Sequence, residues 1–105
     1  MIETISKASE IPWESAAGYP PGTEWKVLQR EDNGEAKAIL LKLPSGFEMS
    51  SHSHIYPEHH YVLRGSYESQ GETFLEDCYQ YIPRHVDHGP FRSTEGAELL
   101  VIWES

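Results

Sequence analysis

Glycine and proline interrupt this chain at short intervals along most of its length. Eight glycines and seven prolines are spread through 105 residues, and they leave uninterrupted segments of mostly about 6–10 residues. Segments of this length are shorter than ordinary helices and match the usual length of strands. The chain is therefore predicted to have an all-β fold.

Two turns separate the first expected strands. Asn33-Gly34, preceded by an aspartate, is the strongest hairpin signal in the sequence. A second tight turn is expected around Gly65. The last expected strand, Leu-Leu-Val-Ile-Trp, is apolar enough to be buried. The expected strands cover residues 25–31, 35–43, 58–63, 67–70, 74–82 and 99–103.

The length fits one small domain with a single core. We expect residues 1–105 to form that domain, with residues 1–24 as an N-terminal arm and edge strand and residues 25–105 as the barrel core. Six or more short strands with alternating polarity in one domain pack as an antiparallel sandwich or barrel.

The charge of the chain limits its partners. Seventeen Asp and Glu residues oppose eight Lys and Arg residues, for a formal net charge of −9, which disfavours binding to nucleic acid or anionic lipid. No apolar run reaches the roughly 18–20 residues that span a bilayer, and the N-terminus lacks the pattern of a secretory signal. Cys78, the single cysteine, excludes an intramolecular disulfide. These features predict a soluble, cytoplasmic protein.

All six histidines lie between positions 52 and 88. In a strand, His52 and His54 would point to the same face, and a bend at residues 55–57 can bring the Glu58 carboxylate back toward them. His88 is a fourth candidate ligand. Such ligands suit one divalent transition metal ion, whether iron, manganese, nickel, copper or zinc. Solvated histidines without a metal are the alternative, because an HxH pair also occurs by chance.

Five residues around the histidine pair have a distinctive spacing, Gly46-x5-His52-x-His54-x3-Glu58-x6-Gly65. At every fixed position this spacing matches the first signature motif of the cupin superfamily. Further along the chain, a proline stands five positions before the last histidine of the sequence, as it does in the second cupin motif. The first motif therefore resembles that of the cupins closely.

The second motif matches less fully. Pro83-x4-His88 has the family spacing, whereas Asp77-Cys78, His85 and Arg92 stand where the motif usually has its opening Gly-Asp, a later Gly and a final Asn. These departures affect turns and the barrel rim and leave the histidine ligand in place.

The resemblance implies a double-stranded β-helix, or jelly-roll, barrel in which His52, His54, Glu58 and His88 hold one metal ion. The chain looks like small RmlC-like cupins of dioxygenase type and like the cupin domain of anti-sigma factors. A dioxygenase of this kind would be an oxidoreductase acting on a dicarbonyl, enol or phenolic small molecule, with Glu58 and His60 as catalytic residues. Two alternatives remain open: a non-catalytic zinc- or ligand-sensing module, and a metal-dependent isomerase or lyase.

Strand alternation predicts the orientation of the other histidines. His60 should face the interior with Glu58, where it orients that carboxylate, acts as an acid or base, serves as a fifth ligand or packs in the core. His59 should face outward, at the surface or a dimer interface. His85 should lie in a loop at the barrel mouth.

Tyr79 and Tyr81 should share one face of their strand. On that face they either fill the core or line a pocket for a planar substrate. We also expect a homodimer, as cupins commonly pair through N-terminal strands, with residues 2–11 or 11–25 contributing.

Overall fold

Two antiparallel β-sheets make up nearly all of the regular structure. The computed structural model describes residues 3–104, in which the helical structure is a single 3-10 turn, η1, at Ala8–Glu10. The strands are β1 (Glu14–Ser15), β2 (Glu24–Arg30), β3 (Ala36–Leu43), β4 (Phe47–Met49), β5 (Glu58–Gly65), β6 (Tyr67–Ser69), β7 (Glu72–Phe74), β8 (Tyr79–Ile82), β9 (Phe91–Ser93) and β10 (Ala97–Trp103). No helix among the described residues is long and apolar enough to cross a bilayer.

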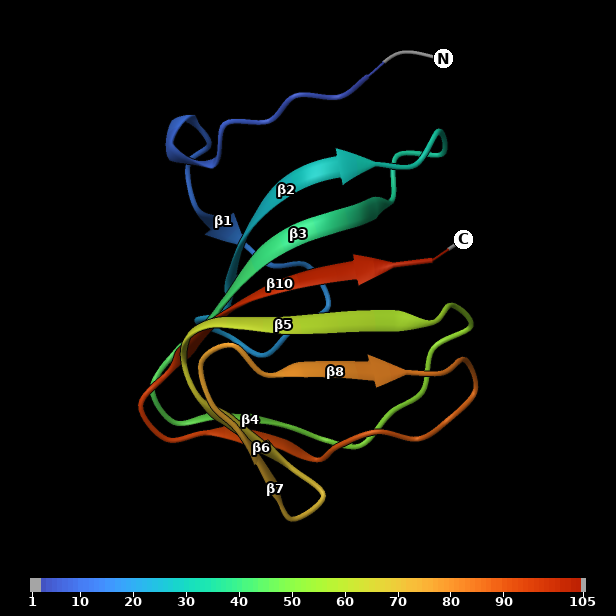
Figure 1. Cartoon of the computed structure of the whole chain (residues 1–105). Helices are drawn as coiled ribbons and strands as arrows, with labels where there is room; N and C mark the ends of the chain where they lie inside the picture. Colours follow the sequence, from blue (N-terminus) through green and yellow to red (C-terminus); the bar gives the residue numbers. More distant parts are fainter. Residues whose placement is uncertain (1–2, 105) are drawn as a thin grey trace.

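The larger sheet has six strands in the order β1-β2-β3-β10-β5-β8, and the smaller has four in the order β4-β9-β6-β7. The six-stranded sheet curves over the smaller one, and the two form a jelly-roll barrel (Figure 1). The predicted all-β jelly-roll fold is confirmed. The C-terminal strand β10 lies inside the larger sheet between β3 and β5, as its apolar sequence predicted.

The predicted hairpin joins β2 and β3. The Gly34 amide donates to the Glu31 carbonyl, and the Glu31 amide donates to the Glu35 carbonyl at 2.7 Å. Gly34 has φ +91°, a conformation that glycine adopts without steric cost. The two strands then pair from Arg30↔Ala36 down to Glu24↔Lys42.

The predicted tight turn at Gly65 connects two different sheets. It does not return the chain beside β5; it passes the chain from the six-stranded sheet, which holds β5, to the four-stranded sheet, which holds β6. Gly65 has φ +71°, and a Cβ there would collide with the Gly96 carbonyl and lie 3.0 Å from the Ala97 Cα. The residue is therefore a glycine because two backbones approach closely at the corner of the barrel.

The prediction of one strand over residues 74–82 is wrong. A turn separates β7 from β8, with the Cys78 amide donating to the Leu75 carbonyl at 3.0 Å and Asp77 at φ +68°. The turn arises because β7 belongs to the four-stranded sheet and β8 to the edge of the other.

The core lies between the sheets and is made of alternating residues of the central strands. Ile39, Val62, Tyr67 and Val101 are the largest fully buried side chains, and burying each of the aliphatic ones contributes about 1.5–3 kcal/mol. The strands of the larger sheet bury every second residue, as shown by β3 and β5. This alternation sends the functional side chains of β5 inward.

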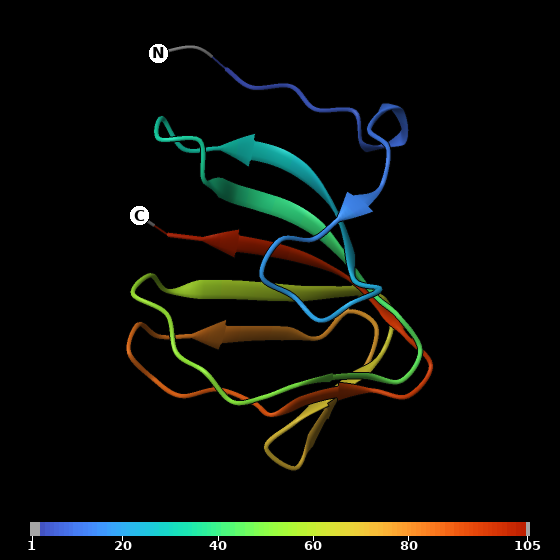
Figure 2. The same cartoon turned by 180° about the vertical axis from the view of Figure 1, so that it is seen from behind.

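The N-terminal segment lies along the outside of β2 and then crosses the barrel opening. The Lys26 ammonium donates to the Ala8 carbonyl at 2.8 Å, and Trp13 lies 4.8 and 4.7 Å from the ammonium groups of Lys26 and Lys42. After β1, residues 16–23 loop in front of β10 and β5 (Figure 2). The loop brings N-terminal side chains to the inner face of the larger sheet.

We expect Gly65→Ala to lower the free energy of unfolding by about 2–4 kcal/mol, because the new methyl group both strains the backbone and meets the Gly96 carbonyl. Urea unfolding followed by circular dichroism measures the loss. Gly71→Ala is the matched control, since Gly71 has φ +80° with no atom within 4 Å of a Cβ; its cost should be about 1 kcal/mol. Equal losses in the two variants would contradict the steric argument.

Candidate metal centre

Three histidines meet at the open end of the barrel. Their ligand atoms, one each from His52, His54 and His88, all lie within 4.8 Å of one another. The ring centroids are 4.2 Å apart for His52 and His88 and 4.8 Å apart for His52 and His54. Such a group of imidazoles is suited to binding a transition metal ion.

Strand register brings His52 opposite His88. The strands β4 and β9 pair with Met49 opposite Phe91, and three residues further along each segment His52 forms a bridge with His88. The His52 amide donates to the His88 carbonyl at 3.0 Å, and the His88 amide donates to the His52 carbonyl at 2.8 Å. The bridge keeps the β4–β9 register across two irregular residues on each side.

The tautomer of His52 follows from its backbone contact. Its Nδ1 lies 2.9 Å from the Ser50 carbonyl oxygen, which can only accept a hydrogen bond. Nδ1 therefore carries the proton and donates it, and Nε2 keeps a free lone pair. A carbonyl that holds the far nitrogen in this way orients an imidazole for a metal.

His88 has no hydrogen-bond partner for its ring. The residue is 3 % exposed, and neither Nδ1 nor Nε2 has a partner within the described part of the chain. A buried polar group without a partner is costly, and coordination of a metal by one nitrogen would remove much of that cost. The site therefore fits a metal ion on the chemistry of its own side chains.

Glu58 lies beside the three histidines, with both carboxylate oxygens in contact with neighbours. Oε1 accepts a hydrogen bond from the Trp103 indole at 2.7 Å and lies 3.3 Å from His54 Nε2. Oε2 contacts His60 Nε2. The group within 4.8 Å consists of the histidines alone, and Glu58 adjoins it through His54.

His60 connects Glu58 to a buried polar chain. The Tyr67 hydroxyl donates to Gln80 Oε1 at 2.6 Å, so its oxygen accepts from His60 Nδ1 at 3.2 Å. On the other side of the ring, His60 Nε2 forms a hydrogen bond with Glu58 Oε2. His60, 6 % exposed, faces the interior and orients Glu58.

Burial sets the ionisation of the cluster. Desolvation lowers the pKa of His88 to about 4, against the opposing attraction of Glu58, and lowers the pKa of His54 in the same way. Desolvation alone would raise the pKa of Glu58, but the hydrogen bond and charge of His60, with smaller contributions from His54 and Trp103, bring it to about 2. At neutral pH His54 and His88 are therefore neutral and Glu58 is ionised, the forms that bind metal.

Two cavities adjoin the cluster. An inner cavity of about 30 Å³ is lined by His52, Glu58, His60 and His88 together with core side chains, and it has room for a group the size of one water molecule. An outer pocket of about 840 Å³ includes His52 and His54 in its lining, a volume typical of small-molecule sites. Tyr19, Met49 and His52 line both, so the two spaces share a wall.

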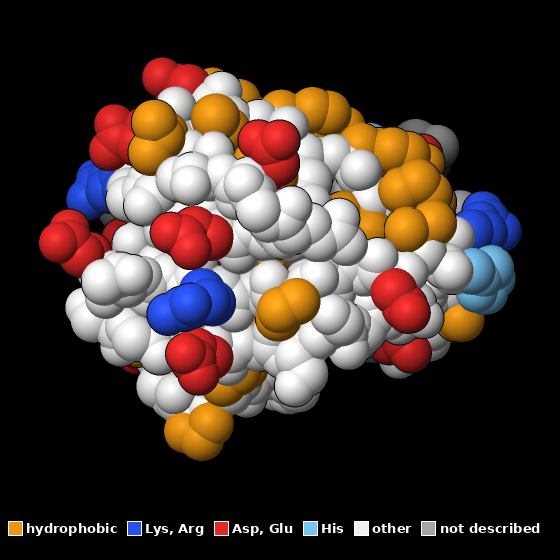
Figure 3. All heavy atoms as spheres, turned by 90° about the horizontal axis from the view of Figure 1, so that it is seen from below, with side chains coloured by type: hydrophobic (Ala, Val, Ile, Leu, Met, Phe, Trp, Pro, Cys, Tyr) orange, Lys and Arg blue, Asp and Glu red, His pale blue; other side chains and the backbone are white. Residues whose placement is uncertain are grey.

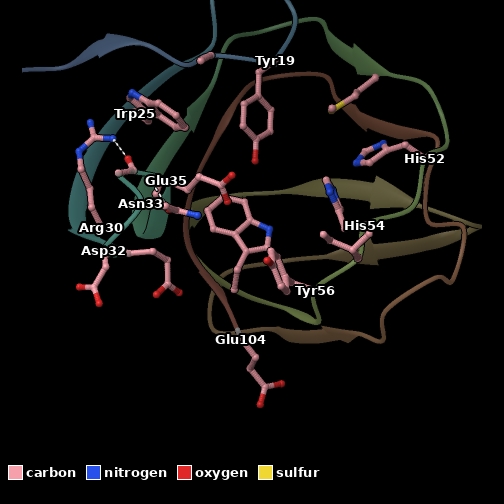
Figure 4. A pocket seen from close by; sticks show the side chains of 18 residues that line it. Tyr19, Trp25, Arg30, Asp32, Asn33, Glu35, His52, His54, Tyr56 and Glu104 are labelled. Carbon is pink, nitrogen blue, oxygen red and sulfur yellow. Dashed lines mark hydrogen bonds between the residues drawn. The ribbon is translucent and has the colours of Figure 1, made fainter.

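Tyr19 is a site residue that the sequence did not indicate. It lies on the loop after β1, and its hydroxyl points into the outer pocket (Figure 4). Desolvation, aided by the negative charge of Glu58, raises the pKa of Tyr19, so the hydroxyl stays protonated as a donor. No periodicity or motif marks a residue that reaches the site from an irregular loop.

Other predicted residues lie away from the pocket. Tyr79 and Tyr81 are 56 % and 47 % exposed on the outer face of β8, so the expectation that they fill the core or line a pocket is wrong. Gln80 and Ile82 take the inward positions instead. His59 also faces outward and contacts the Tyr79 hydroxyl.

The exposed His85 lies on the loop before His88, and it joins the site only through its backbone. Its amide donates to the His54 carbonyl at 2.8 Å, and its side chain lines neither cavity. The contact ties the two histidine-bearing loops together.

A jelly-roll barrel with histidines converging at its open end defines this protein as a cupin. The family model described as the ChrR cupin-like domain matches residues 2–104, and the chain belongs to that family. The predicted resemblance is confirmed. A comparison with curated proteins gave no significant match.

Solved structures share the fold at low sequence identity. An RmlC-like cupin from Shewanella frigidimarina is 22% identical, with a TM-score of 0.75 over 97% of this chain and 90% of that one. The anti-sigma ChrR of Rhodobacter sphaeroides, in complex with SigE, is 22% identical with a TM-score of 0.70, and the match covers 93% of this chain but 52% of that chain. An acetylacetone dioxygenase from Acinetobacter johnsonii is 17% identical with a TM-score of 0.82 over 98% and 74%.

The lowered pKa of His88 predicts how the metal-free protein responds to acid. Unfolded His88 binds a proton near pH 6.5, whereas the folded form binds one only near pH 4. Between these values the unfolded state holds more protons, so the free energy of unfolding should fall as the pH is lowered, by about 2–3 kcal/mol from this residue. Glu58 extends the fall from pH 4.5 toward 2.

Urea unfolding in EDTA at several pH values measures this dependence. His88→Gln should flatten the slope between pH 6.5 and 4, whereas His85→Gln, which removes an exposed histidine, should leave it unchanged. A wild-type stability that stays constant across this range would contradict the burial argument.

Proposed function

We propose that the protein binds one divalent transition metal ion through His52, His54, Glu58 and His88. The observation that carries the proposal is the buried His88 ring, which has no hydrogen-bond partner and lies beside two further imidazoles. Three neutral imidazoles and one carboxylate suit iron, manganese, nickel, copper or zinc. They leave a divalent ion with one net positive charge.

We further propose that the protein is a small-molecule metalloenzyme of dioxygenase type, acting on a dicarbonyl, enol or phenolic substrate. A divalent metal held by these four residues would supply Lewis-acid or redox chemistry at the wall of the outer pocket. The similarity in fold to an acetylacetone dioxygenase supports a substrate with two oxygens placed for chelation. The pocket of about 840 Å³ has room for such a molecule.

The residues around the site have distinct tasks in this proposal. Glu58 and His60 are the catalytic pair, because the proton that they share can move between Oε2 and Nε2 when a substrate gains or loses a proton. Tyr19 donates its hydroxyl hydrogen to a substrate oxygen. Trp103 holds Glu58 Oε1 in position through its indole N–H.

A second candidate is a non-catalytic zinc- or ligand-sensing module. Membership in the ChrR cupin-like family and the fold shared with an anti-sigma factor bound to its sigma factor favour it. The match covers 52% of that anti-sigma chain. The two candidate functions differ in that the dioxygenase needs dioxygen, whereas the sensing module does not.

Metal analysis and oxygen-electrode assays separate these functions. The untagged protein should contain close to one transition metal ion per chain and should consume oxygen with a dicarbonyl or phenolic compound. Zinc without oxygen uptake would instead favour the sensor, or a metal-dependent isomerase or lyase if an anaerobic substrate turns over.

His88→Ala should lose the bound metal and all activity together, since a buried ligand is removed. His85→Ala is the matched control, because the His85 side chain lines neither cavity. This variant should keep both its bound metal and its activity. Elemental analysis of the two variants after dialysis provides the measurement. Full metal content in the His88 variant would exclude it as a ligand.

We also propose a homodimer, formed through the outer face of the six-stranded sheet in place of the N-terminal residues 2–11 or 11–25 expected from the sequence. Tyr61, Leu63, Tyr79 and Tyr81 are 38–56 % exposed on neighbouring strands β5 and β8 of that face. Seen from below, hydrophobic side chains gather along one edge of the molecule, whereas carboxylates are scattered over the rest (Figure 3). Apolar patches of this kind commonly form interfaces.

Light scattering at micromolar concentration should give twice the chain mass of 12.0 kDa. Leu63→Glu should produce monomers, because it introduces a charge into the apolar face. Val86→Glu, at a similarly exposed residue on the loop between β8 and β9, should remain dimeric. A monomeric wild type would contradict the proposal.

A further inference from the structure

The outer pocket has an aromatic wall next to the histidines. Trp25 of β2 and Trp103 of β10 are half-buried, and Tyr56, 38 % exposed, completes the wall near His54. The indole of Trp103 is held by its hydrogen bond to Glu58. Rigid aromatic side chains of this kind pack against planar ligands.

The rim opposite the histidines is acidic. Four carboxylates, from Glu31, Asp32, Glu35 and Glu104, line the pocket together with one guanidinium, from Arg30. In Figure 4, the residues of the β2–β3 hairpin lie on the side of the pocket away from His52 and His54. The pocket therefore has a metal-ligating side and an acidic side.

Few positive charges balance these carboxylates. Glu31 is paired with Lys37 at 3.3 Å, and the Arg30 guanidinium donates to the Gly34 carbonyl at 2.8 Å, which holds it against its own hairpin. Within residues 3–104, neither Asp32 nor Glu35 forms an ion pair. The rim thus keeps an excess of negative charge.

The consequence is a difference in potential across the pocket. A ligand that chelated a metal at the histidine side would extend its other end along Trp25 toward the hairpin. A negative group at that end meets uncompensated carboxylates, whereas a positive group is attracted to them. Because the rim is solvent-exposed, the effect is modest and is weakened by salt.

We infer that the pocket selects planar, chelating ligands whose far end is neutral or positively charged, and discriminates against ligands with an anionic far end. The inference rests on the proposed function, since it takes the chelating end to be at the histidines. It names the substrate class more narrowly than the fold does, because Asp32 and Glu35 belong to a hairpin outside both cupin motifs.

Three catechols with the same chelating end test this selectivity. Dopamine has a positive side chain, 4-ethylcatechol a neutral one and 3,4-dihydroxyphenylacetate a negative one. Their dissociation constants are measured by titration calorimetry on the zinc-loaded protein under nitrogen, so that no oxidation competes with binding. Titrations are made at about 20 mM salt, where charge screening is weak, and at about 0.5 M salt, where it is strong.

We expect dopamine to bind about three- to tenfold more tightly than 3,4-dihydroxyphenylacetate at low salt, with 4-ethylcatechol between them and the differences smaller at high salt. In an Asp32→Asn/Glu35→Gln variant the affinity ratio of dopamine to 3,4-dihydroxyphenylacetate should fall below its wild-type value. Intrinsic differences in zinc affinity cancel, because each ligand is compared with itself across variants.

The control variant is Glu76→Gln/Glu95→Gln, which changes the net charge equally at exposed residues that line neither cavity. It should keep the wild-type ratio. Equal ratios in the two double variants, or tightest binding of the anionic catechol, would overturn the inference and leave the proposed function standing. If none of the three binds to protein that holds zinc, the chelation step of the proposed function fails, and the inference fails with it.

Discussion

The paired backbone of His52 and His88 is the constraint on which the site depends. Each residue donates its amide to the carbonyl of the other, and this bridge continues the register of β4 and β9 beyond the last regular pair. A slip of one residue would turn one of the imidazoles to the outside of the barrel. The geometry of the cluster is thus set by main-chain pairing, which places the side chains before any metal binds.

The polar groups behind the cluster extend this order into the core. His60, Tyr67 and Gln80 form a hydrogen-bonded chain that ends on Glu58, and Trp103 holds the other oxygen of the same carboxylate. In a buried setting such a network is costly unless its members are satisfied. His88 is the member of the site left without a partner, and this imbalance distinguishes the centre from a structural polar core.

The loop of residues 16–23 gives the open end of the barrel its pocket. Tyr19 lines both the inner cavity and the outer pocket, and the loop crosses in front of the inner face of the larger sheet. The charged hairpin at the far rim comes from a different part of the fold. The histidine side of the pocket, where the proposed chemistry takes place, and the hairpin rim, where the proposed selectivity arises, therefore belong to separate elements of the fold.

Local patterns in the sequence determined the central strands β2, β3, β5 and β10, the Asn33-Gly34 hairpin and the inward orientation of Glu58 and His60. Turn chemistry and a period of two residues act between near neighbours. The motif spacing likewise indicated the histidines that converge. Only the tertiary structure decided that Gly65 leads into the second sheet, that Tyr79 and Tyr81 face outward, and that Tyr19 enters the pocket. These outcomes depend on which sheet each segment joins and on long-range packing, and no local pattern encodes either.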